Sequence, residues 1–239
     1  MKSTFKKSSI IFLGLTFCIG AFAQSTPRPP QYVVLAFDGS KNLEFWNESR
    51  DFSKNNNLKF TYFVSGVYWL SNGVSKIYKN PNTGTARSCI GYGETTADVQ
   101  KRVEQVNLAF LEKNEIASHA NGHCEGAKSW SESQWDSEFS QFNKFIFDAF
   151  KINGFAGSNS FKVSDIVGFR APFLAYSTGM WGTLKSFGYR YDTSKSDSPN
   201  YWPKKINSIW NFPLGRIGIA GTAKKTLSMD YNFYVSDSG

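Results

Sequence analysis

Histidine, cysteine and long apolar runs are all scarce in this sequence. Among its 239 residues there are two histidines and three cysteines. No apolar run reaches the roughly 18 residues that a membrane-spanning helix needs, so we expect no membrane span. Lysine and arginine form no dense run, which disfavours nucleic acid as a partner. Internal repeats and low-complexity segments are also absent, which leaves the pattern of an ordinary folded domain.

The N-terminal residues 1–23 have the features of a secretory signal peptide. Three lysines precede an apolar run over residues 10–21, and an A-x-A tripeptide ends at Ala23. This order of a charged segment, an apolar segment and a small-residue cleavage pattern is typical of secreted proteins. A membrane anchor is the alternative, but the run is too short for a span. We therefore expect cleavage near Ala23 and a periplasmic or extracellular protein.

The mature chain, residues 24–239, is long enough for one domain with its own core. Loss of the three N-terminal lysines lowers the formal net charge from +8 to +5. This modest basic excess suits an anionic polymer such as a cell wall. We expect a monomer.

Two cysteines, Cys89 and Cys124, remain after the signal peptide is removed. In an oxidising compartment such a pair favours a disulfide over two free thiols. The alternative is that Cys124, which directly follows His123, is a metal ligand.

Apolar strands alternate with amphipathic helices along the mature chain. The continuous apolar runs at 32–37 and 59–64 are typical of buried strands in a parallel sheet. A polar stretch over about 71–95 predicts a long loop. Thr95 and Asp98 predict a capping box at the start of the next helix, and a short strand at Ile116 follows it.

Another helix is predicted by apolar residues at helical spacing, with Ser129 and Glu132 as its expected cap. The stripe consists of Trp135, Phe139, Phe142, Ile146 and Phe150. It is most simply a core face packed on a sheet. Further expected elements are strands at 166–169, near 189–191 and at 208–212, and a helix that carries Trp181, Leu184 and Phe187. Repeated β-then-α units predict an α/β fold with a parallel sheet, open or closed as a barrel.

Three polar residues follow predicted strands directly. Asp38 comes after the first strand, His119 after the strand at Ile116, and Arg170 after the strand at 166–169. The carboxyl ends of parallel strands are where such folds build their sites. Taken singly, Asp38 could cap a helix, His119 could be a satisfied core histidine, and Arg170 could form a structural ion pair. Their convergence favours a site.

The two histidines, His119 and His123, lie four residues apart, as in one half of a metal site. The segments AFDGS (36–40), SHANGH (118–123) and RAPF (170–173) resemble the first three motifs of the polysaccharide deacetylases with a NodB homology domain, carbohydrate esterase family 4. Neighbouring residues are most similar to the chitin deacetylase-like branch. The resemblance spans about residues 31–215, with the 71–95 loop as an insertion.

The resemblance implies a deformed (β/α) barrel that removes N-acetyl groups from N-acetylglucosamine units of chitin or peptidoglycan. It implies a divalent metal, typically Zn²⁺, that polarises the amide carbonyl and activates water. Asp38 matches the catalytic base, His119 and His123 match the metal ligands, and Arg170 matches the arginine that orients the base. A hydrolase acting on carbon–nitrogen bonds of linear amides is therefore expected.

Substrate contacts are expected from Pro172 and from aromatic residues near the motifs. Phe173, Tyr176 and Trp202 could stack on sugar rings, although core packing explains each of them equally well.

The first motif departs from the family pattern, because Gly39 stands where a metal-binding aspartate is usual. In the ungapped alignment Asp38 is the base and one metal ligand is missing. A slip of one residue would instead make Asp38 the metal ligand and remove the base. Two histidines alone predict weaker metal binding than the usual three protein ligands.

The second departure is the absence of any histidine after His123, where the family has a late catalytic acid. Either the reading frame is truncated or the protein is a degenerate paralogue. Two alternatives to an active deacetylase stay open. One is a catalytically impaired family member that binds glycan, and the other is an unrelated α/β metalloprotein.

Overall fold

The computed structural model of the chain describes residues 32–237. Every element named below belongs to one compact unit, which begins at Val34. The expected signal peptide and its cleavage near Ala23 lie outside the described residues. The elements follow in this order: β1 (Ala36–Gly39), α1 (Leu43–Asn55), β2 (Thr61–Val64), η1 (Gly66–Trp69), η2 (Asn72–Ile77), α2 (Thr96–Leu111), β3 (Glu115–Ser118), η3 (Ala127–Ser129), α3 (Glu132–Phe147), α4 (Ala149–Asn153), η4 (Val163–Asp165), β4 (Gly168–Phe169), η5 (Pro172–Leu174), α5 (Thr178–Ser186), β5 (Tyr191–Asp192), β6 (Ser196–Asp197), β7 (Lys204–Ile206), β8 (Ile209–Asn211), β9 (Leu214–Gly218), β10 (Lys225–Leu227) and α6 (Asp230–Asp237).

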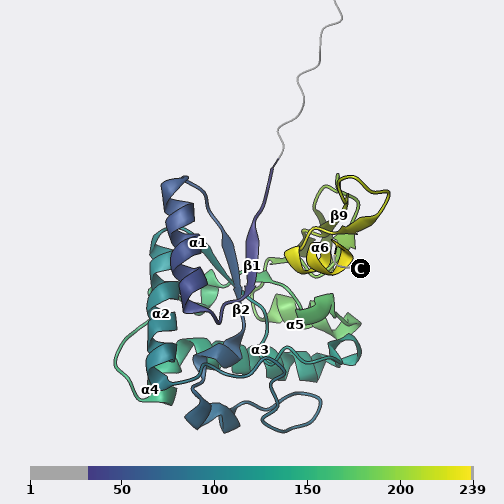
Figure 1. The fold of residues 1–239 in the computed structure, drawn as a ribbon. Helices are drawn as coiled ribbons and strands as arrows, with labels where there is room; N and C mark the ends of the chain where they lie inside the picture. The colour runs from purple at the N-terminus through teal and green to yellow at the C-terminus, as the bar shows by residue number, and fades with distance from the viewer. Residues whose placement is uncertain (1–31, 238–239) are drawn as a thin grey trace, which may run out of the picture. The chain divides into compact units, whose positions relative to one another are not determined.

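The main sheet has seven strands in the order β1-β2-β3-β4-β5-β8-β7. All neighbouring pairs are parallel except β8 and β7, which are antiparallel. Helix α1 follows β1, and helix α2 precedes β3. The two helices pack against each other (Figure 1). The expected α/β fold with a mainly parallel sheet is confirmed. A smaller sheet, β10-β9-β6, was not predicted.

The first strand differs from its prediction in position and in burial. The apolar run at 32–37 predicted a buried strand, but β1 begins only at Ala36 and its apolar neighbours are exposed. Val34 is 76% exposed and Phe37 43%. The physical reason is that β1 is an edge strand with β2 as its neighbour. The Phe37 ring stacks on Tyr62 of β2 at 5.5 Å between centroids and meets the Phe60 ring in a T-shaped contact at 5.2 Å.

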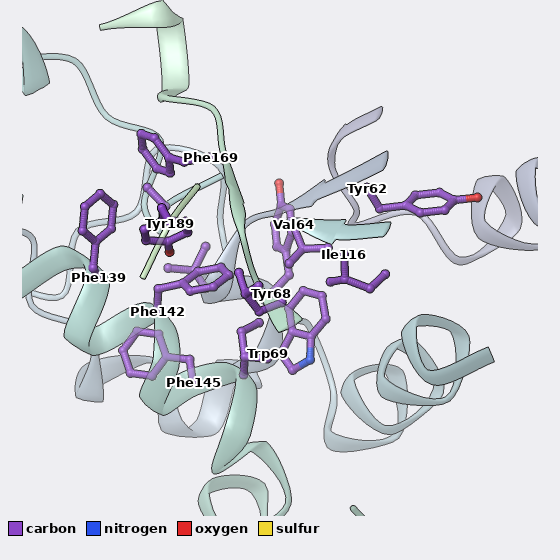
Figure 2. Close-up of a cluster of buried hydrophobic side chains, with 14 of the residues drawn as sticks. Tyr62, Val64, Tyr68, Trp69, Ile116, Phe139, Phe142, Phe145, Phe169 and Tyr189 are labelled. Atoms are coloured by element: carbon purple, nitrogen blue, oxygen red, sulfur yellow. The ribbon is translucent and has the colours of Figure 1, made fainter. Parts of the chain in front are cut away.

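The aromatic stripe of α3 forms the core beneath the sheet (Figure 2). Phe139 packs edge-on against Phe169 of β4 at 5.0 Å between ring centroids, and against Tyr189 at 5.2 Å. The predicted core face is confirmed, although Phe150 lies in the separate helix α4. The cap is two residues later than predicted, at Ser131 with Gln134, because only this pair closes both capping hydrogen bonds.

The remaining local predictions are mostly confirmed. Thr95 and Asp98 form the capping box of α2. The 71–95 segment holds no α-helix or β-strand, and its one regular element is the short 3₁₀ helix η2. A disulfide joins Cys89 in this loop to Cys124, as expected. Among residues 32–237, no helix is both long and apolar enough to span a membrane.

Candidate functional site

The strand register places the predicted polar residues at the carboxyl ends of the strands of the main sheet. Ser118 of β3 pairs with Phe169 of β4, which in turn pairs with Asp192 of β5. The residues that follow, His119 and Arg170 among them, are therefore level with one another. Their backbone N–H groups still continue the ladder, since Arg170 N donates to the carbonyl of Ser118 at 3.0 Å.

Arg170 and Asp38 form an ion pair at these strand ends. Nη1 of Arg170 donates to Oδ1 of Asp38 at 2.8 Å, and Nε donates to the Thr193 hydroxyl at 2.7 Å. The guanidinium carbon lies 4.4 Å from the centroid of the Phe63 ring. The Arg170 side chain is only 8% exposed, whereas that of Asp38 is 23% exposed. The guanidinium is therefore fixed on three sides and sets the orientation of the Asp38 carboxylate.

His119 is buried at the end of β3, with one ring nitrogen already engaged. Its Nδ1 lies 2.7 Å from the backbone carbonyl oxygen of Arg170. A carbonyl oxygen can only accept, so Nδ1 carries the proton and Nε2 keeps a free lone pair. Burial lowers the pKa of His119 to about 4, with the charge of Asp38 opposing the shift. A neutral imidazole oriented by its other nitrogen is the usual form of a metal ligand.

His123 faces His119 from the end of the same loop. The two ring centroids are 5.1 Å apart, and the ring of Phe173 lies 4.6 Å from that of His123. Burial also lowers the pKa of His123, which keeps it neutral at physiological pH. The loop thus presents two neutral imidazoles side by side.

Left-handed backbone occurs at the end of β1 and within a few residues after β3 and β4. The φ angles are +93° at Gly39, 54° at Ala120, 46° at His123 and 56° at Phe173. Residues other than glycine adopt this region at a cost of roughly 1–2 kcal/mol each. Such strain persists only where the surroundings hold it, and it concentrates at functional sites.

The donor set fits a divalent metal only in part. Imidazole nitrogens suit zinc, and the charge of Asp38 is close enough to act on the pKa of both histidines. Within residues 32–237, however, no group of three or more His, Cys, Asp and Glu side chains is arranged to hold a metal ion. His119 and His123 therefore fit two of the three protein ligands that a catalytic zinc site usually has. Position 39 supplies no third donor.

The substrate candidates do not all lie together. Phe173 is 55% exposed and, besides contacting His123, lines a cavity of about 330 Å³ with Arg87 and the disulfide. Tyr176 lines a different cavity, of about 420 Å³, with Trp181. Pro172 is buried, and Trp202 is 71% exposed. Phe173 is thus an aromatic candidate in direct contact with a predicted site residue, His123.

No protein-family model and no curated protein matches the chain. Solved structures do match. In fold, the chain is similar to family 4 carbohydrate esterases.

Three of these structures illustrate the similarity. A putative polysaccharide deacetylase from Mycobacterium smegmatis is 14% identical, with a TM-score of 0.47 over 76% of this chain and 57% of that one. The chitin deacetylase of the fungal pathogen Colletotrichum lindemuthianum is 19% identical, with a TM-score of 0.43 over 66% and 53%. A family 4 pseudoenzyme from Bacillus anthracis is 13% identical, with a TM-score of 0.42 over 65% and 40%.

The chain thus spans between 40% and 57% of the length of these three structures. At such identities and TM-scores the likeness concerns the fold, and no residue of this chain takes its role from it.

Asp192 and its neighbours were not predicted as site residues. Oδ1 of Asp192 accepts a hydrogen bond from the Ser194 hydroxyl at 2.5 Å, and Ser194 Oγ accepts one from the backbone N–H of Ala171 at 2.8 Å. Burial raises the pKa of Asp192 to about 6. This chain of bonds holds the loop that begins with Arg170. The available signal was an aspartate at the end of a strand, the same signal that identified Asp38.

Glu138 of α3 was also missed, although its burial was predictable. It lies on the apolar face of α3, at the same helical spacing as the aromatic stripe. Its Oε1 accepts from the backbone N–H of Asn121 at 2.9 Å and its Oε2 from the Tyr78 hydroxyl at 3.2 Å. Burial raises the pKa of Glu138 to about 7, while these hydrogen bonds oppose the shift. An ionisable residue on a core face is the signal that could have identified it.

Proposed function

We propose that the protein is a metal-dependent hydrolase that removes N-acetyl groups from polysaccharide containing N-acetylglucosamine, such as chitin or peptidoglycan. The observation that carries the proposal is the Asp38–Arg170 ion pair beside two neutral histidines, at the carboxyl ends of neighbouring parallel strands. A carboxylate base and a pair of imidazole ligands are the parts that metal-assisted amide hydrolysis requires.

His119 and His123 would hold the metal, and Zn²⁺ suits their nitrogen donors. The bound metal supplies a Lewis acid for the amide carbonyl and for the attacking water. Arg170 keeps Asp38 oriented as a carboxylate, and Asp38 accepts a proton from that water. In this proposal the same Asp38 returns the proton to the amine as the carbon–nitrogen bond breaks. The products are acetate and a free amino sugar.

Acetate release tests the proposal. The protein is incubated with acetylated chito-oligomers or with peptidoglycan at increasing zinc concentration, and free acetate is measured. We expect release that requires metal and stops with a chelator. His123→Gln serves as the matched control, since it removes one imidazole and leaves Asp38 and Arg170 in place. Failure of both substrates to release acetate at any zinc concentration would exclude the activity.

A glycan-binding member of the same fold with impaired catalysis is the second candidate. It is favoured by Gly39, whose φ of +93° suits glycine and provides no carboxylate. Pull-down of the protein on insoluble chitin or peptidoglycan, without acetate release, would support this candidate. The exposed Phe173 ring beside His123 then becomes the expected sugar contact, and Phe173→Ala should reduce retention.

A further inference from the structure

The loop from His119 to His123 has a backbone that it would not adopt alone. Ala120 and His123 are both left-handed, with φ of 54° and 46°. Residues with a Cβ are uncommon in this region, and alanine gains nothing there, so the neighbouring structure has to hold the conformation. The orientation of His123 relative to His119 therefore depends on what the loop is tied to.

Glu138 provides the central tie. It is 1% exposed and lies on α3, which is separate in sequence from the loop. Its Oε1 accepts from the Asn121 backbone N–H at 2.9 Å, and its own backbone carbonyl accepts from Asn121 Nδ2 at 2.7 Å. Asn121, midway between the two histidines, is thus held by two hydrogen bonds to one residue.

The second carboxylate oxygen of Glu138 acts through Tyr78 on Gly122, the next residue of the loop. Its Oε2 accepts from the Tyr78 hydroxyl at 3.2 Å. That hydroxyl lies against Gly122, where an added Cβ would come within 2.5 Å of it. One buried carboxylate therefore connects to both residues that precede His123.

From this geometry we propose that Glu138 is a positioning residue, which fixes the Asn121–Gly122 backbone so that His123 faces His119. The inference rests on the proposed function in one respect: the positioning has a purpose only if His119 and His123 bind one metal. The test of the inference is independent of that function, because it follows the histidine signals of the metal-free protein. Partners that orient ligands from outside a metal site are typically worth 10- to 100-fold in metal affinity.

The experiment uses the fact that the chain holds two histidines only. Histidine ring ¹⁵N labelling then gives two sets of ring signals in an NMR spectrum of the metal-free protein. We expect Glu138→Leu, which keeps the volume but cannot accept, to move the His123 signals. His119 signals should stay, because the end of β3 and the Arg170 carbonyl hold that ring. Zinc affinity of Glu138→Leu should fall about 10- to 100-fold.

Two variants separate positioning from stability. Glu138→Gln keeps an acceptor for the Asn121 N–H and should leave both histidines in place. Ile146→Ala lies further along α3 and is fully buried. It should destabilise the protein without moving His123. Unchanged histidine signals in a folded Glu138→Leu, or equal movement in Ile146→Ala, would overturn the proposal.

If Glu138→Leu does not fold, hydrogen exchange of the wild-type protein decides instead. The Asn121 amide should be strongly protected, and exchange at the rate of an open loop would overturn the proposal. The histidine spectra and the exchange rates are both measured without substrate or metal. A protein that releases no acetate but shows these spectra would therefore refute the proposed function and keep Glu138 as a positioning residue.

Discussion

The two halves of the candidate site are held in very different ways. The histidine half is buried: His119 is 2% exposed, its loop is tied to α3 through Glu138, and a disulfide at Cys124 connects it to the 71–95 loop. The carboxylate half lies on the edge strand β1, where Asp38 is oriented by an ion pair with Arg170.

In the proposed function, this contrast separates the residues that would bind the metal from the residue that would react. A preorganised ligand pair needs many fixed contacts, and the histidine half has them. The carboxylate half combines one charged side chain, Asp38, with a glycine at the next position. The orientation of the Asp38 carboxylate therefore depends on Arg170. The predictions below perturb each half in turn.

The largest effect is expected at Asp38. Asp38→Asn removes the proposed base and leaves a side chain of similar shape, so acetate release should fall by about 10²–10⁴-fold. Zinc affinity should change far less, because the histidines are held independently. The measurement is acetate release together with zinc titration of both proteins. An equal loss of zinc binding would instead assign Asp38 to the metal.

The disulfide tests the histidine half. Cys89 and Cys124 are 35 residues apart, and a loop of that length gives roughly 4 kcal/mol of stabilisation in the chain-entropy model. Replacing both cysteines by serine should lower the free energy of unfolding by about 2–4 kcal/mol in urea. A reducing agent should produce the same loss in the wild type and none in the variant. The Asp38–Arg170 ion pair should persist in both.

Asp192 gives a pH dependence with a definite sign. Its pKa rises from 3.8 to about 6 on folding. The unfolded chain therefore loses this proton first. The contribution of Asp192 to the free energy of unfolding is full below pH 4 and falls as pH rises toward 6. The shift corresponds to a loss of up to roughly 3 kcal/mol.

Asp192→Asn should remove this dependence, since its amide can face the Ser194 hydroxyl without ionising. Urea unfolding of both proteins at pH 4 and pH 7 is the measurement. Equal pH dependence in the two proteins would show that Asp192 titrates normally in the folded state.

The smallest effect concerns Gly39. Its φ of +93° lies in a region that residues with a Cβ rarely adopt, while the nearest atom to an added Cβ is 3.9 Å away. The cost of Gly39→Ala is therefore backbone strain, of about 1–2 kcal/mol. Gly39→Asp should lose a similar amount, measured by urea unfolding, before its carboxylate contributes anything. Comparison of zinc affinity between these two variants isolates the carboxylate.

Much of the site was predictable because strand ends are marked in the sequence. Apolar runs that stop at Asp38, His119 and Arg170 indicated a shared sheet edge, and the observed register places them there. The residues that orient them were harder to predict. Glu138 acts from a helix across the core, and only the packing of α3 brings it to Asn121.

Burial of the first strand could not be predicted from its composition. The apolar run at 32–37 is indistinguishable from a central strand, yet β1 lies at the edge of the sheet. Strand order depends on long-range pairing, which hydrophobic periodicity does not encode. The second sheet was missed for a related reason, since β6 and β10 are two and three residues long.

The edge position of β1 has a consequence for solution behaviour. An edge strand offers backbone N–H and C=O groups to any extended segment that approaches, and a charged side chain on it opposes such pairing. Asp38 is that charge on β1. Its neutralisation in Asp38→Asn therefore removes a barrier to self-association as well as the proposed base. Light scattering over a range of concentrations should show the variant to be less soluble than the wild type.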